Sequence, residues 1–226
     1  MIPLRDSIRA RQKPYVNWLL IVVNFIVFFS YLGLSQSRLE ELYFQYGVVP
    51  SKVVYLLQTG ASWHLVLIPF ITAMFLHGGW LHIIGNMWYL FIFGDNVEDR
   101  LGHARFLLFY LITGIIGSLA HVLMNAGSPI PTVGASGAIA GVLGGYFLLF
   151  PRARILSLVP FFVFFMVEIP AVFFLAFWFI LQLINGAVSL GGVANPMAWV
   201  AHVGGFLAGA VLIKLIAPRH SNNLPH

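Results

Sequence analysis

The chain has 226 residues, of which 60% are hydrophobic and only 8% are charged. Soluble domains carry about 25% charged residues and must hydrate a large surface, so an ordinary soluble fold is excluded and lipid is the expected solvent. The net charge of +5 comes from basic residues scattered in ones and twos, which argues against a nucleic-acid partner, and the absence of cysteine excludes disulfides and thiolate metal sites.

Six apolar stretches are candidates for membrane crossings. A crossing needs about 20 mostly apolar residues, and its backbone must satisfy its own hydrogen bonds, which makes these stretches helices. In chain order they are Asn17–Leu34, Trp80–Phe93 with its flanks, Phe106–Met124, Ser136–Phe150 with its flanks, Ile169–Val188 and Ala198–Ile216. The predicted fold class is all-α: a polytopic membrane protein with a cytoplasmic segment 1–16, a six-helix transmembrane domain 17–217 and a cytoplasmic tail 218–226.

Two further apolar stretches are too short to cross. His64–Phe75 contains Pro69 and is expected to be interfacial or partly inserted. Ile155–Val167 is interrupted by Pro160 and is expected to lie beside the fifth span.

The basic residues favour six crossings. With six, ten cations lie on one side of the membrane and only Arg38 and Lys52 on the other. The positive-inside rule then places both termini in the cytoplasm. The mixed cluster Asp95, Glu98, Asp99 and Arg100 falls on that side and is predicted to cap helices and form ion pairs.

Polar side chains collect near the outer ends of three predicted helices. Ser136 begins the fourth span, His202 lies about one turn into the sixth, and His82 and Asn86 lie early in the second. Polar residues at such depth are costly and mark functional sites. His82 and Asn86 share a helix face because they are four residues apart.

Stripes of small residues predict how two of these helices meet. Gly137, Gly141 and Gly145 recur every four residues in the fourth span, as do Ala201, Gly205 and Gly209 in the sixth. Such stripes allow close backbone approach, which would bring Ser136 within hydrogen-bond reach of His202. A histidine that accepts the hydroxyl proton makes serine a usable nucleophile.

Four segments together resemble the rhomboid family of intramembrane serine proteases. They are HGGWLHIIGN at 77–86, GDNVEDRLG at 94–102, GASG at 134–137 and AHVGGFLAG at 201–209, and their order and the six-span layout match as well. The resemblance runs from about Met74 to Gly209. The serine motif alone is weak, but the combination is strong.

The resemblance implies a catalytic Ser136–His202 dyad without a third acid, and an oxyanion site formed by His82, Asn86 and the Ser136 amide. The resemblance also implies that the substrates are transmembrane segments of other membrane proteins, cut near the outer face. Nothing in the sequence requires a cofactor or a metal. The expected partners are single-span membrane proteins and membrane lipid, and the expected location is the prokaryotic inner membrane. The outer loop containing Gly191, Gly192, Asn195 and Pro196 is expected to cap the site, with the fifth span as a lateral gate.

The chain departs from the family pattern at Ala140, where many relatives carry an aromatic residue that stacks on the catalytic histidine. Tyr146 and Trp199 are the expected replacements. Two alternatives stay open: an inactive relative that binds and escorts membrane helices, and a transporter or channel. A transporter predicts polar residues along a whole path and often internal repeats, whereas here polar residues collect on the outer side.

Overall fold

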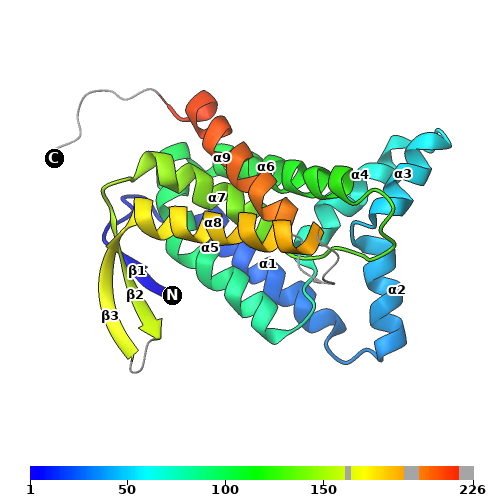
Figure 1. The fold of residues 1–226 in the computed structure, drawn as a ribbon, viewed down its shortest axis with the longest axis horizontal. Helices are drawn as coiled ribbons and strands as arrows, with labels where there is room; N and C mark the ends of the chain where they lie inside the picture. The colour runs from blue at the N-terminus through cyan, green and yellow to red at the C-terminus, as the bar shows by residue number, and fades with distance from the viewer. Residues whose placement is uncertain (161–163, 191–198, 219–226) are drawn as a thin grey trace.

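A computed structural model of the chain describes residues 1–160, 164–190 and 199–218 (Figure 1). The helices and strands in chain order are β1 (Ile2–Asp6), α1 (Tyr15–Tyr31), α2 (Gln36–Tyr46), α3 (Pro50–Gln58), α4 (Trp63–Thr72), the 3₁₀ turn η1 (Ala73–Phe75), α5 (Trp80–Leu101), α6 (His103–Met124), α7 (Ser136–Leu149), β2 (Arg154–Pro160), β3 (Phe164–Pro170), α8 (Ala171–Leu190) and α9 (Trp199–Ile216). The predicted helical membrane bundle is confirmed.

All six stretches predicted to cross form helices. Among the described residues, three helices, α6, α8 and α9, are long and apolar enough to span a bilayer. The segment α4–η1 together with α5 is also long and apolar enough, but the two are bent by 87° relative to each other. Helices α1 and α7 are apolar but have 17 and 14 residues. At 1.5 Å per residue α7 reaches about 21 Å, less than a bilayer core of about 30 Å. The count of six crossings therefore stays a prediction.

The stretch Ile155–Val167 does not form a helix, and the all-α expectation missed the sheet that contains it. Strands β2 and β3 pair antiparallel, and β1 from the N-terminus pairs antiparallel with the other edge of β2, with Ile2 opposite Leu158. The hairpin is apolar on both faces, so it lacks the alternation that reveals a half-buried strand. Its partner β1 lies more than 140 residues away, which local pattern cannot show.

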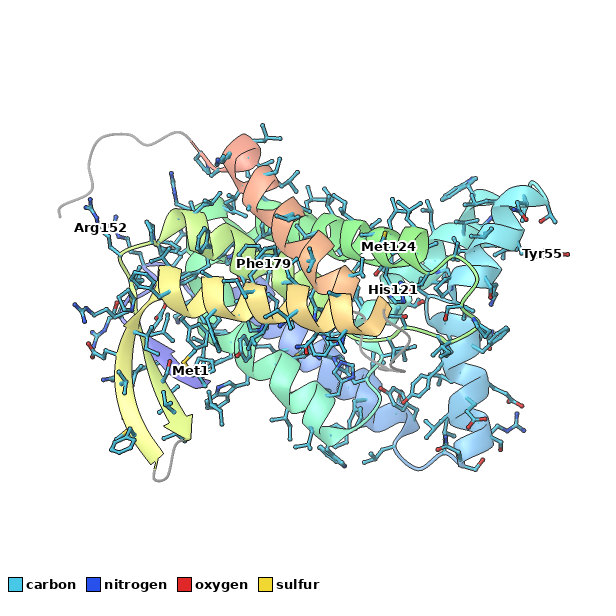
Figure 2. The ribbon with its side chains drawn as sticks, in the orientation of Figure 1. Met1, Tyr55, His121, Met124, Arg152 and Phe179 are labelled. Carbon is cyan, nitrogen blue, oxygen red and sulfur yellow. The ribbon has the colours of Figure 1, made fainter. Side chains whose placement is uncertain are left out.

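The two ends of the bundle carry different secondary structure. Helices α2 and α3 gather at one end, and the three strands lie at the other (Figure 1). Figure 2 places Met1 and Arg152 at the strand end and Tyr55 at the opposite end. Arg100 lies at the strand end as well, since Asn96 one turn earlier in α5 donates to Asp6 of β1 at 2.8 Å. The Arg100 guanidinium donates to the Pro218 carbonyl at 2.9 Å, beyond the end of α9. The structure thus gathers these predicted cytoplasmic segments at one end.

Glu98 caps the start of α1 from a neighbouring helix. Its carboxylate, 1% exposed, accepts the backbone N–H groups of Val16 at 3.0 Å and Asn17 at 2.7 Å. These N–H groups have no partner inside α1, and a negative charge is favourable at a helix N-terminus. The predicted capping role of the acidic cluster is confirmed for Glu98.

Asp6 ties the N-terminal strand to two helices. Its Oδ2 atom accepts hydrogen bonds from the Tyr146 hydroxyl of α7 at 2.6 Å and from the Asn96 amide of α5 at 2.8 Å. Burial raises the pKa of Asp6 above its ordinary value of 3.8, and these hydrogen bonds only partly oppose the effect.

Glycines let α7 and α9 pack at backbone contact, as the small-residue stripes predicted. A Cβ added to Gly205 would collide with the Gly137 carbonyl oxygen, and one added to Gly209 would collide with the carbonyl oxygen of Gly141. The Gly141 position also faces the Thr113 side chain of α6. Helices α6, α7 and α9 therefore form the tightly packed centre of the bundle.

We expect Gly209→Ala to lower stability by about 1–3 kcal/mol, because the added methyl overpacks a backbone contact. The matched control is Gly85→Ala, where an added Cβ meets nothing within 4 Å and reduced chain entropy favours folding. Thermal unfolding of both variants in detergent measures the difference. Equal melting temperatures would contradict the packing.

We expect the difference in stability between Asp6→Asn and wild type to shift in favour of the variant as the pH rises from 4 to 7. A raised pKa means that the folded protein binds the proton more tightly than the unfolded chain. The contribution of Asp6 is therefore most favourable below 3.8 and declines as the pH rises through the folded pKa. Asparagine keeps the acceptor oxygen but does not ionise. Melting temperatures of both proteins at the two pH values test this, and a difference independent of pH would oppose it.

Candidate active site

Ser136 is the first residue of α7, at the end of a turn that only glycine permits. Gly134 has φ +129°, and its N–H donates to the Ala73 carbonyl at 2.8 Å. A Cβ at Gly134 would lie 2.7 Å from His82 Nε2 and 3.8 Å from Ser136 Oγ. The absence of a side chain at Gly134 thus makes room for the His82 imidazole against the turn that leads into Ser136.

His202 of α9 contacts Ser136 directly. Its Nε2 atom lies 2.7 Å from Ser136 Oγ, although 66 residues separate the two in the chain. The contact follows from the backbone approach of α7 and α9, because Gly137 and Gly205 lie one and three residues farther along. The structure therefore brings together the serine and the histidine that the sequence analysis paired.

Gln182 of α8 is a site residue that the sequence analysis missed. Its Oε1 atom lies 2.8 Å from His202 Nδ1, and its Nε2 donates to the Trp178 carbonyl at 3.1 Å. The side chain is only 5% exposed. A signal was present, since a glutamine inside an apolar span is costly, but nothing in the sequence indicated which helix it would face.

Two tryptophans surround the imidazole of His202. The Trp199 ring meets it edge-on with centroids 5.9 Å apart, and the Trp178 ring lies at 6.1 Å with an interplanar angle of 33°. Trp199 was one of the two expected replacements for the missing aromatic at Ala140, whereas Trp178 was not foreseen. Tyr146, the other, is bonded to Asp6 at the strand end.

His82 and Asn86 form a connected pair on α5. The Asn86 amide donates to the His82 carbonyl at 2.9 Å, and His82 Nδ1 accepts the Gly78 N–H at 3.3 Å. This second bond leaves His82 Nε2 as the nitrogen that faces Gly134. The structure thus brings His82 to the Gly134 turn that precedes Ser136, while the amide group of Asn86 donates within its own helix.

Two further histidines, His121 and His77, have neighbours other than the Ser136–His202 pair. His121 lies 3.0 Å from the Thr132 hydroxyl and 3.3 Å from the Asn125 amide, in contact with the loop before α7. His77 is fully buried, with its ring 5.1 Å from that of His82. Among the described residues, no group of three or more His, Asp or Glu side chains is arranged to hold a metal ion. The predicted cap, Gly191 to Pro196, lies outside the described residues.

Fold and site together define an integral membrane protein with a serine–histidine pair inside its helical bundle. Residues 59–219 match the Rhomboid domain, and the chain belongs to the rhomboid family.

Relatives from plants, bacteria and yeast share this similarity. The chain is 36% identical over 194 residues to RHOMBOID-like protein 6, mitochondrial, of Arabidopsis thaliana, covering 84% of this chain and 53% of that protein. It is 32% identical over 202 residues to rhomboid protease GluP of Bacillus subtilis, covering 88% of this chain and 35% of the relative. It is 32% identical over 151 residues to Rhomboid protein 1, mitochondrial, of Saccharomyces cerevisiae, covering 64% of this chain and 40% of that protein. The chain thus spans about a third to a half of these relatives.

Proposed function

We propose that the chain is an intramembrane serine endopeptidase that hydrolyses peptide bonds in or near the transmembrane segments of other membrane proteins. The observation that carries the proposal is the 2.7 Å contact between Ser136 Oγ and His202 Nε2. This is hydrogen-bond distance between a nucleophile and a base. The name of the Bacillus relative, a rhomboid protease, supports the same activity.

The proposed reaction proceeds through an acyl-enzyme. Ser136 Oγ attacks the carbonyl carbon of the substrate while His202 Nε2 takes the hydroxyl proton. The peptide C–N bond breaks as His202 returns that proton to the leaving amine. Water then attacks the ester, with His202 again as the base, and releases the new carboxyl end and free Ser136. No redox step and no co-reactant besides water are needed.

The proposed oxyanion site lies beside the Gly134 turn. The Ser136 backbone N–H is in the first turn of α7, where N–H groups lack helical partners, and it supplies one donor. His82 Nε2, which faces the Gly134 turn, supplies another in the tautomer that its bond from Gly78 favours. Asn86 is the third proposed member, through the second N–H of an amide whose first N–H donates to the His82 carbonyl. One such donor is worth about 3–4 kcal/mol in a serine protease.

The proposed substrates are single-span membrane proteins, and the proposed barrier to their entry is α8. The outward side of this helix carries exposed apolar residues such as Phe177, Ile184 and Val188, so a substrate helix in lipid would meet it first. Bilayer lipid is the second proposed partner.

The proposed location is the prokaryotic inner membrane, with both termini cytoplasmic, residues 17–217 as the transmembrane domain and the site opening to the extracytoplasmic side. The collection of Arg100, Arg152 and the N-terminal cations at one end supports this orientation. The mitochondrial relatives from Arabidopsis and yeast make an organelle membrane the alternative.

We expect Ser136→Ala and His202→Ala each to lower kcat by at least about 10³-fold, because either change removes the nucleophile–base pair. Purified protein in lipid is assayed with a panel of single-span substrates. Labelling by a fluorophosphonate, which reacts with an activated serine, should disappear in Ser136→Ala.

The matched control is Ser30→Ala, an exposed serine of α1 whose hydroxyl donates to the Val27 carbonyl of the same helix, and it should keep full activity and labelling. A wild-type protein that binds the substrates but neither cleaves them nor reacts with the probe would instead support the inactive escort.

A further inference from the structure

We infer that Gln182 is a positioning residue that holds His202 in the tautomer needed for proton transfer. The inference rests on the proposed function and extends it from a pair of residues to a chain of three. Gln182 bonds His202 Nδ1 and acts through the imidazole.

The direction of the Gln182 amide is determined by its second bond. The Trp178 carbonyl can only accept, so the group 3.1 Å from it is the NH₂ of Gln182. The oxygen of the amide must then face His202 Nδ1, at 2.8 Å. An oxygen acceptor requires that Nδ1 carry a proton. In the neutral ring Nε2 is then unprotonated and accepts from Ser136 Oγ.

The same bond also serves the charged ring. When His202 takes the serine proton, both ring nitrogens carry hydrogen, and Nδ1 still donates to Gln182 Oε1. A neutral amide therefore supports both states of the histidine without adding a buried negative charge, which would be costly in this apolar surrounding. Gln182 is 5% exposed, and most other residues of α8 are apolar. Contact with water therefore does not account for a polar side chain at this position.

Helix α8 supplies two of the contacts around the imidazole. Trp178 and Gln182 lie four residues apart on one face, and the Trp178 ring covers His202 while Gln182 bonds it. A displacement of α8 that opens a path from the lipid would remove both contacts at once. His202 is thus fully oriented only when α8 is packed against α9.

The test compares Gln182→Leu with Gln182→Glu. Leucine has similar volume but no acceptor, and we expect kcat to fall about 10–100-fold with KM nearly unchanged, the range seen when a ligand-orienting partner is removed. Glutamate restores an acceptor for Nδ1–H and should recover much of kcat, while its buried charge lowers the melting temperature of the variant. The control is Leu183→Ala, which shortens an exposed side chain on the same helix and should leave kcat unchanged.

A second readout does not depend on turnover. The ¹⁵N shifts of His202, assigned by their absence in His202→Asn, report which nitrogen carries the proton. We expect the Nδ1–H form in wild type and a mixture in Gln182→Leu. Unchanged kcat and an unchanged tautomer in Gln182→Leu would overturn the inference. If wild type proves inactive, the proposed function fails, while the tautomer still decides the role of Gln182.

A different observation carries a second proposal. At the strand end, a cavity of about 480 Å³ opens between the chain preceding α1, the first turn of α1 and residues 91–95 of α5. The structure assigns it to the headgroup and upper chain of an anionic phospholipid.

The chain segment before α1 makes the cavity basic. Four of its cations line the cavity, Arg5, Arg9, Arg11 and Lys13, and within the described residues none of the four makes an ion pair. Two carboxyl groups, Asp6 and Asp95, also line it, but the first accepts bonds from Tyr146 and Asn96. Four cations thus face two acids, and a phosphate fits the surplus.

The helices contribute apolar side chains to the cavity. Trp18 of α1 and Phe91 of α5 line it, and the two residues are 44% and 58% exposed. A tryptophan at a span end is typical of the membrane interface. Cations together with exposed apolar side chains match a phosphate with an acyl chain, and basic pockets between membrane helices bind such headgroups. Free phosphate would leave the apolar side chains without a partner.

The test measures quenching of Trp18 by brominated lipids in detergent micelles, taken as the difference between wild type and Trp18→Phe. We expect stronger quenching by brominated phosphatidylglycerol than by brominated phosphatidylcholine. The preference should disappear in the double variant Arg9→Gln, Arg11→Gln and persist in the control Arg38→Gln, whose cation pairs with Glu41 on α2.

Thermal unfolding gives the second readout. Phosphatidylglycerol should raise the melting temperature of wild type more than phosphatidylcholine does, through preferential binding to the folded state, and less so in the double variant. Inorganic phosphate at the same concentration should have no such effect. Equal quenching by both lipids, or equal stabilisation by phosphate, would refute a lipid site.

Discussion

The backbone contact between α7 and α9 is the constraint on which the site depends. Carbonyl oxygens of Gly137 and Gly141 occupy the space that side chains at Gly205 and Gly209 would need. In a bilayer, helices gain little from hiding apolar surface from one another, because lipid is equally apolar, so close packing of small residues supplies much of the association. This packing sets the separation at which Ser136 and His202 meet.

The site lies at the start of α7, next to the point where α7 and α9 come into backbone contact. Ser136 begins α7 directly after the Gly134 turn, so its hydroxyl and backbone N–H lie at the open end of a helix. His202 comes from α9, and His82 from α5 across the turn. Helix α8 completes the arrangement through Gln182. Four segments far apart in the chain converge, yet each contributes one or two side chains.

The strand end holds the bundle together by polar contacts. Glu98 accepts from the start of α1, Arg100 donates to the chain after α9, and Asp6 joins β1 to α5 and α7. The GDNVEDRLG segment, one of the four that resemble the family, therefore has a structural role: it connects α5 to the chain ends through hydrogen bonds. It lies at the end of α5 opposite to His82, so the same helix serves architecture at one end and the site at the other.

Composition and residue spacing by themselves determined that this chain is a helical membrane protein and where its apolar helices lie, and together with the family resemblance they favoured a pairing of Ser136 with His202. They could do so because lipid imposes length and polarity on each segment separately, and because four-residue stripes of glycine mark a packing face. Only the tertiary structure decided the rest. It showed that Ile155–Val167 pairs with the N-terminus in a sheet, that Tyr146 bonds Asp6 and not the histidine, and that Gln182 bonds His202. These contacts join residues from 20 to more than 140 positions apart. Their partners depend on how each helix is rotated about its axis, which side-chain packing sets and local sequence does not record.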